Sequence, residues 1–261
     1  MFPGIYIQKS LTLVPTKYMD MKKLAFLITV FFCGIMSAQE LDGSWKLIAV
    51  NGEPVNNRES IRIYQDGYFS SGTREKGTNR FISAEGGEYT LNGEYTEVYD
   101  FYTQDSGMVG KQRNYTVEIS EDQMVFQTDS GEEMTWQNIS DKENDLSGNW
   151  VITGRQRNGE LRRSTPGARR TIKILGGDRF QWVAFNSDTG EFFGTGGGTY
   201  TAQNGRYVEN IGFFSRDDSR VGAELPFDYE VRDGEWHHSG KSSKGDPMYE
   251  IWSPYNEAYK K

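Results

Sequence analysis

Two glutamates in aromatic-rich segments are the residues best placed to do chemistry. Glu97 lies in the segment YTEVYDF and Glu209 in the segment YVENIGF. Alternate residues of a β-strand share a face. Each glutamate should therefore share the more apolar face of its strand with Tyr95, Tyr99 and Phe101 in the first segment, and with Tyr207, Ile211 and Phe213 in the second. Because an unpaired buried carboxylate is costly, we expect each one to meet an arginine, a lysine or a tyrosine hydroxyl, or to face a wet cavity. Each glutamate is then either a hydrogen-bond hub that holds the fold or a contact to a ligand.

A second group of candidate residues lies near the C-terminal end. His237 and His238, the only histidines, lie in EWHHSG, and Glu250 follows in YEIW. Adjacent strand residues point to opposite sides, so the two histidines cannot ligate one metal ion together, and we expect no metal site. One histidine with Glu209 and Glu250 would form a carboxylate–imidazole cluster suited to acid–base catalysis. The alternative, which the burial habits of histidine favour, is a solvated strand end.

The composition argues against several classes of function. The net charge of −8 argues against binding to a nucleic acid backbone. Cys33 is the only cysteine, so a disulfide framework within the chain is excluded. The stretch GTGGGTY lacks the Lys-Ser/Thr pair and the following helix of a phosphate-binding loop, and it favours glycine-rich turns or bulges. We expect no cofactor.

The chain carries one pattern twice. Trp45 matches Trp150 at an offset of 105 residues, SIRI at 60–63 matches TIKI at 171–174 at an offset of 111, and the two glutamates match at an offset of 112. Small increases in offset at turn-like segments are expected of two diverged copies with loop insertions. The sequence predicts one unit at 41–140, a polar linker at 141–145 and a second unit at 146–254.

Each unit has the two-residue period and the turn signals of an all-β structure. Short segments such as FDYEV and YEIW are rich in aromatic and β-branched residues. Turn signals such as Asn204-Gly205 and Asp233-Gly234 separate these segments. We expect about eight short antiparallel strands per unit, and such a long meander usually closes into an up-and-down barrel because closure removes the exposed edges. The predicted fold is therefore two small antiparallel β-barrels in tandem.

The motifs resemble a known group of barrels. Gly-x-Trp, at Gly43–Trp45 and Gly148–Trp150, is similar to the opening motif of lipocalin-like (calycin-type) barrels. The second unit also resembles uncharacterised lipocalin-like domains of secreted Bacteroidota proteins through Gly197, Gly198, Tyr200, Thr201, Tyr207, Glu209, Gly222, Glu250 and Trp252. The first unit departs from this pattern with Met134 at the position of Glu250. The resemblance covers nearly all of residues 41–253 and implies that Trp45 and Trp150 plug the closed end of each barrel.

The N-terminal residues 1–40 predict an upstream extension followed by a signal peptide. Met21 precedes two lysines and an apolar run that ends in small and polar residues, which is the layout of a secretory signal, and Met21 is the expected true start. The run is too short for a comfortable membrane span, although an uncleaved anchor is the alternative. Phe32 precedes Cys33 where lipid attachment favours a small residue, so we do not expect a lipoprotein. The sequence predicts export to the periplasm or beyond, with membrane contact only through this segment.

The two units differ in their balance of charged residues. Residues 41–140 hold 8 basic and 17 acidic side chains, whereas residues 146–253 hold 14 of each. The second unit also contains the basic segment RQRNGELRRSTPGARR at 155–170. This segment is either an attractor for an anionic ligand or for the acidic first unit, or a solvated loop.

These observations lead to a binding protein as the expected function. We expect non-catalytic binding of a small hydrophobic or amphipathic ligand, lipid-like or a sugar, in one or both barrels. The expected ligand-binding residues are Tyr95, Glu97, Tyr99, Tyr207, Glu209, Phe213 and Trp182. One alternative is an enzyme whose catalytic residues are Glu209, Glu250, His237 and His238. The other is a structural or protein-interaction module with filled barrels.

Overall fold

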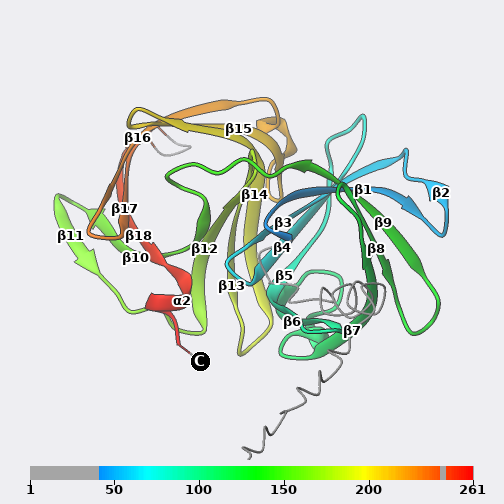
Figure 1. Cartoon of the computed structure of the whole chain (residues 1–261). Helices are drawn as coiled ribbons and strands as arrows, with labels where there is room; N and C mark the ends of the chain where they lie inside the picture. The colour runs from blue at the N-terminus through cyan, green and yellow to red at the C-terminus, as the bar shows by residue number, and fades with distance from the viewer. Residues whose placement is uncertain (1–40, 242–244, 261) are drawn as a thin grey trace, which may run out of the picture. The chain divides into compact units, whose positions relative to one another are not determined.

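The computed structural model describes residues 41–241 and 245–260. Within them the chain forms two closed antiparallel barrels of eight strands each, as the sequence predicts (Figure 1). The expected signal peptide, with Met21 and Cys33, lies outside the described residues. No helix within the described ranges is long and apolar enough to cross a membrane.

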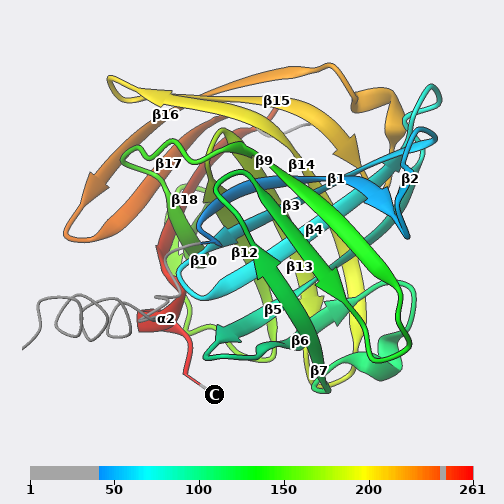
Figure 2. The same cartoon turned by 45° about the vertical axis from the view of Figure 1, so that its right-hand side comes forward.

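The first barrel is a meander that closes on itself. Its strands are β1 (Gly43–Val50), β3 (Arg58–Gln65), β4 (Tyr68–Glu75), β5 (Phe81–Leu91), β6 (Tyr95–Tyr102), β7 (Gln112–Ile119), β8 (Gln123–Gln127) and β9 (Glu133–Ser140). Each strand pairs with the next, and β1 pairs with β9 to complete the cylinder, which Figure 2 shows from the side. The two-residue strand β2 (Glu53–Pro54) pairs antiparallel with the end of β1, and a short 3-10 turn (Ser106–Met108) follows β6.

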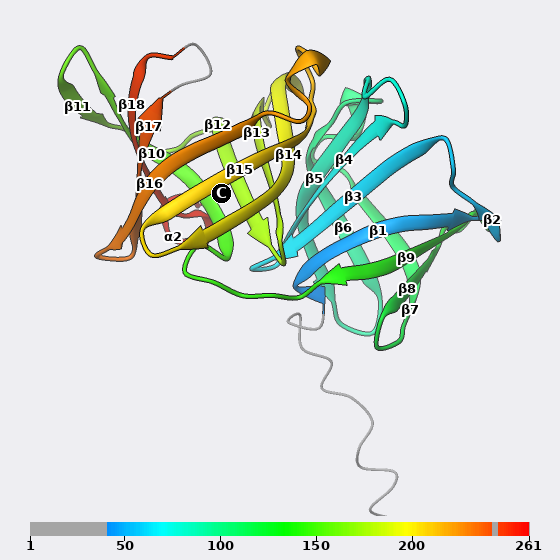
Figure 3. The same ribbon diagram turned by 90° about the horizontal axis from the view of Figure 1, so that it is seen from above.

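The second barrel repeats this arrangement strand for strand. Its strands are β10 (Gly148–Arg157), β12 (Arg169–Gly176), β13 (Arg179–Asn186), β14 (Glu191–Gln203), β15 (Arg206–Phe214), β16 (Glu224–Arg232), β17 (Glu235–Lys241) and β18 (Pro247–Pro254). Pairing of β10 with β18 closes it, and Figure 3 shows the strands curving round. The short β11 (Glu160–Arg163) pairs antiparallel with the end of β10, as β2 does with the end of β1. A 3-10 turn (Asp218–Arg220) follows β15, and the one-turn helix α2 (Tyr255–Ala258) follows β18.

Equivalent residues make equivalent local bonds in the two copies. The indole Nε1 of Trp45 donates to the carbonyl of Leu41, and that of Trp150 donates to the carbonyl of Leu146, both at 2.9 Å. The predicted hairpin turn at Asn204-Gly205 has both residues at positive φ, which is the backbone that glycine and asparagine tolerate best. The repetition of these details supports an origin by duplication.

A β-bulge in each copy changes which residues face the lumen. Gly198 pairs with Ile211 and Gly197 pairs with Phe213, so Gly212 is an extra residue in β15. In β6 the extra residue is Asp100. An extra residue shifts the alternation by one. The expectation that Phe101 and Phe213 share the faces of Glu97 and Glu209 is therefore wrong.

The outer walls of the two barrels contribute to one apolar cluster. Ile63 and Tyr68 from the first barrel belong to it, as do Ile172, Val183 and Phe185 from the second. The displaced Phe101 and Phe213 also lie here: Phe101 contacts Phe185 with ring centroids 5.2 Å apart, and Phe213 stacks on Phe81 at 6.3 Å. The bulges thus turn one aromatic ring per copy from the lumen to the contact between the barrels.

A buried ion pair joins the barrels inside this contact. Arg170 Nη2 donates to Asp100 Oδ2 at 2.8 Å, and the hydroxyls of Tyr68 and Tyr255 donate to the same carboxylate oxygen. Asp100 is the extra residue of the first bulge, whereas its counterpart Gly212 has no side chain. Of the basic segment at 155–170, Arg170 therefore binds the acidic first unit rather than solvent.

Candidate functional site

The lumen of each barrel contains one buried ion pair at the same position. Arg62 Nη1 donates to Glu97 Oε1 at 2.6 Å in the first barrel, and Lys173 Nζ donates to Glu209 Oε1 at 2.7 Å in the second. All four side chains are at most 6% exposed. The cations come from β3 and β12, from the matching segments SIRI and TIKI. Each glutamate thus has a cationic partner, one of the outcomes that the sequence predicts.

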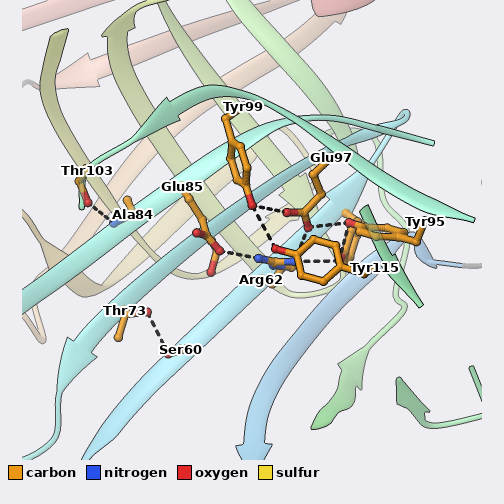
Figure 4. A network of polar contacts seen from close by, with 12 residues as sticks. Ser60, Arg62, Thr73, Ala84, Glu85, Tyr95, Glu97, Tyr99, Thr103 and Tyr115 are labelled. Atoms are coloured by element: carbon orange, nitrogen blue, oxygen red, sulfur yellow. Dashed lines mark hydrogen bonds and ion pairs between the residues drawn. The ribbon is translucent and has the colours of Figure 1, made fainter. Parts of the chain in front are cut away.

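Tyrosines surround the ion pair of the first barrel. The hydroxyl of Tyr95 donates to Glu97 Oε1 at 2.9 Å and that of Tyr99 donates to Oε2 at 2.7 Å. Tyr115 contacts the Tyr99 hydroxyl, and Arg62 also holds Glu85, as Figure 4 shows. Burial, reinforced by the charge of Glu97, raises the pKa of Tyr95 well above its ordinary value. These tyrosines therefore stay protonated and act as hydrogen-bond donors that saturate Glu97.

The second barrel has a simpler ion pair and a larger cavity. Tyr207 donates to Glu209 at 2.9 Å, and there is isoleucine, Ile211, at the position of Tyr99. The cavity has a volume of about 510 Å³, against about 260 Å³ in the first barrel. Its charged and polar lining includes Arg155, Lys173, Glu209, Arg216, Arg220, His238, Lys241 and Glu250, and its apolar lining includes Trp182, Ile211, Phe214, Leu225, Phe227, Met248 and Trp252.

Three strands place a row of charged and polar residues beside this cavity. His238 on β17 lies opposite Glu250 on β18, and Glu250 lies opposite Arg155 on β10. Arg155 Nη2 donates to Glu250 Oε1 at 2.6 Å. Burial alone would raise the pKa of Glu250. Contact with His238 and the charge of Arg155 instead lower this pKa from 4.5 to about 2. Glu250 is therefore ionised at neutral pH.

His238 is buried without a hydrogen-bond partner. It is 1% exposed, and its Nδ1 lies 3.7 Å from Glu250 Oε2, which is too long for a hydrogen bond. Burial, and then the charge of Lys173, lower its pKa, so the ring is neutral. Both ring nitrogens are unpartnered among the described residues, and the indole Nε1 of Trp252 is unpartnered as well.

The sequence-predicted residues separate into three groups. Glu209, Glu250, His238 and Trp182 line one cavity. Tyr95, Glu97, Tyr99 and Tyr207 belong to the ion-pair networks, and in the first barrel the cavity wall is formed by Arg62 rather than by Glu97. Phe213 faces the other barrel, and His237 points out of the lumen, with its Nδ1 2.6 Å from the hydroxyl of Tyr249.

Two corrections to the sequence analysis follow from these positions. The solvated strand end favoured for the histidines is wrong for His238, because strand alternation turns its ring inward while His237 faces outward. Arg62 and Lys173 were not among the predicted site residues. A sequence signal for these two residues exists, because a basic residue occupies the third place of both matching segments, SIRI and TIKI.

The described residues contain no cluster of three metal-ligating side chains. Comparisons with known proteins add no further site residues, because no family model and no curated protein matches the chain.

Proposed function

We propose that the protein is an exported, lipocalin-like carrier that binds a small amphipathic ligand non-covalently in the lumen of the second barrel. The cavity of about 510 Å³ carries this proposal. Its volume lies within the range of about 300–1,000 Å³ that is typical of small-molecule pockets. An eight-stranded barrel can be filled by its own side chains, and a cavity of this size favours a ligand over a filled module.

The lining of the cavity favours a ligand with one apolar body and one polar end. Trp182, Phe214 and Phe227 offer an aromatic wall for the body. A neutral imidazole has one donor and one acceptor, and an indole has one donor. The unpartnered nitrogens of His238 and Trp252 therefore suit a hydroxyl or carbonyl group of the ligand. Burying these groups unsatisfied is costly, so the ligand would gain from pairing with them.

One observation favours an enzyme as the second candidate. His238, Glu250 and Glu209 line the same cavity, and His238 is neutral and so able to accept a proton. Against it, the ion pair with Lys173 occupies Glu209, and that with Arg155 occupies Glu250. His237 faces away from the lumen and takes no part in either candidate.

The test compares two matched cavity-filling variants of the full chain. Ala184 lines the second cavity and Thr73 lines the first, and they are equivalent in the two copies. We expect Ala184→Trp to reduce at least ten-fold the ligand that co-purifies, as seen by native mass spectrometry, and the fluorescence of bound anilinonaphthalene sulfonate. Thr73→Trp should retain both signals.

The same experiment distinguishes the candidates. An unchanged ligand load in Ala184→Trp, with cooperative unfolding retained, would remove the second lumen as the site. A ligand mass that stays constant during incubation supports a carrier. Conversion of the ligand to a new mass, abolished in His238→Phe, would replace the carrier by the enzyme.

A further inference from the structure

The cavity of the first barrel has a different chemistry from that of the second. Its volume is about 260 Å³, and polar side chains provide much of its lining: Arg58, Ser60, Arg62, Ser71, Thr73, Ser83, Glu85, Gln104, Arg113 and Glu132. Several positions that are apolar or aromatic in the second barrel are polar here. Ser71 stands in place of Trp182, and Arg113 in place of Leu225. An apolar body would leave these polar groups desolvated, so the two lumens suit different ligands.

Two buried donors in this cavity have no acceptor. Arg62 Nε and Trp136 Nε1 are both unpartnered among the described residues, although both side chains are nearly fully buried. Each of these groups is donor only, so neither can satisfy the other. The two side chains are neighbours, with the guanidinium carbon of Arg62 4.9 Å from the centre of the Trp136 ring. A ligand that fills this place must therefore bring acceptor atoms.

The guanidinium of Arg62 is held in place before any ligand arrives. Its two terminal nitrogens donate to Glu97 and Glu85 (Figure 4). Its guanidinium carbon lies 4.8 Å from the centre of the Phe69 ring. These contacts fix the direction of the free Nε–H. A donor that is fixed in advance loses little conformational entropy when it binds.

Two further arginines line this cavity. Arg58 and Arg113 form no ion pair with any of the described residues. The lining also contains Glu132, which is exposed, and Glu85, which Arg62 already holds. Arg62 donates to Glu85, and this ion pair offsets the negative charge that would otherwise repel an anion. The two unpartnered donors and the positive charges of Arg58 and Arg113 favour an acidic acceptor over a neutral one.

We propose that the first barrel is a second binding site, separate from that of the second barrel, for a small carboxylate whose oxygens accept hydrogen bonds from Arg62 Nε and Trp136 Nε1. A planar carboxylate matches the edge of a guanidinium and accepts charge-assisted hydrogen bonds. The smaller volume limits the ligand to a smaller body than the second cavity accepts. Arg58 and Arg113 attract the anion electrostatically.

The test titrates the full-length protein with sodium succinate at constant ionic strength and follows the indole N–H signals by nuclear magnetic resonance. We expect the Trp136 signal, assigned with Trp136→Phe, to shift and saturate, while the Trp252 signal stays in place. Succinamide, the uncharged analogue, should leave both signals unshifted. Trp252→Phe is the matched control and should bind succinate as the unaltered protein does.

A second variant keeps the proposal testable if Trp136→Phe fails to fold. Arg58→Gln/Arg113→Gln changes two residues that are not fully buried, and we expect it to weaken succinate binding at least ten-fold. An equal response to succinamide, stronger binding of inorganic phosphate, or no shift of Trp136 would each overturn the proposal. Ligand binding in the second barrel is read from Ala184→Trp, so the two proposals can fail independently.

Discussion

The two lumens share one ion pair, and one row of three residues is among the positions at which they differ. Arg62–Glu97 and Lys173–Glu209 occupy matching places in both barrels. The row His238–Glu250–Arg155, by contrast, corresponds to Phe126–Met134–Val50 in the first barrel, on the same three strands and in the same register. Because the pair is common to two lumens of different character, it belongs to the scaffold. The residues that differ decide what each lumen binds.

The largest expected effect comes from removing a glutamate of the shared ion pairs. Arg62 has a second carboxylate, Glu85, whereas a glycine, Gly196, stands at the position of Glu85 in the second barrel. Glu209→Gln should therefore cost about 3–5 kcal/mol of unfolding free energy, because it leaves the buried ammonium of Lys173 without a carboxylate partner. Glu97→Gln should cost less, about 1–3 kcal/mol, since Glu85 remains.

Urea unfolding of the full chain, followed by circular dichroism, measures both losses. Each variant should keep a cooperative transition, so that the two free energies can be compared. An equal or larger loss of unfolding free energy in Glu97→Gln would show that Glu85 does not compensate the charge of Arg62. The ion pair of the first barrel would then be at least as sensitive to losing its glutamate as that of the second.

A smaller effect is expected from giving the second barrel the residues of the first. In the pair Arg155–Glu250, the arginine side chain is 44% exposed and the glutamate 8%. Arg155→Val should cost about 2 kcal/mol because it leaves Glu250 buried without its partner. Glu250→Met should cost less than about 1 kcal/mol, since Arg155 can turn to solvent.

The double variant Arg155→Val/Glu250→Met sharpens this prediction. It restores the apolar pair of the first barrel, and we expect it to be more stable than Arg155→Val alone. A double-mutant cycle from urea unfolding should give a coupling of about 1–2 kcal/mol. Additive losses would mean that the pair contributes nothing as a pair.

The smallest effect is a difference in the response to acid. The folded chain holds His238 with a lowered pKa, so the unfolded chain binds a proton there first as the pH falls below 6.5. Unfolding free energy should therefore decrease from pH 7 downward. Glu250 adds a further loss between pH 4.5 and about 2, because its pKa is also lowered in the folded state.

Thermal unfolding between pH 7.5 and 5.0 isolates the contribution of His238. We expect His238→Phe, which introduces the residue found in the first barrel, to flatten the dependence of the melting temperature on pH. His237→Gln is the comparison. Burial, and then the charge of Arg232, also lower the pKa of His237, but its ring is only partly buried, so the slope should change less than in His238→Phe. If the melting temperature of His238→Phe still fell steeply with pH, another group would be responsible for the acid sensitivity.

The sequence predicted which residues near the two glutamates face inward, but not where a bulge reverses that alternation. Alternation placed Glu97 and Glu209 on inward faces and the two adjacent histidines on opposite sides of their strand. It failed at Phe101 and Phe213 because a bulge depends on how closely two strands approach. At Gly198 any Cβ would collide with the carbonyl of Asn210, and that close contact accommodates the extra residue Gly212. A single sequence does not mark which residue is extra.

The amino-acid sequence by itself determined the duplication, the strand period, barrel closure and the need of two glutamates for partners. These follow from local rules, since side-chain direction repeats every two residues and a buried charge must be compensated. Only the tertiary structure decided that Arg62 and Lys173 are those partners, that Asp100 joins the two barrels, and that the second lumen is larger than the first. Cavity volume depends on how side chains from eight strands pack together, and no local segment encodes that.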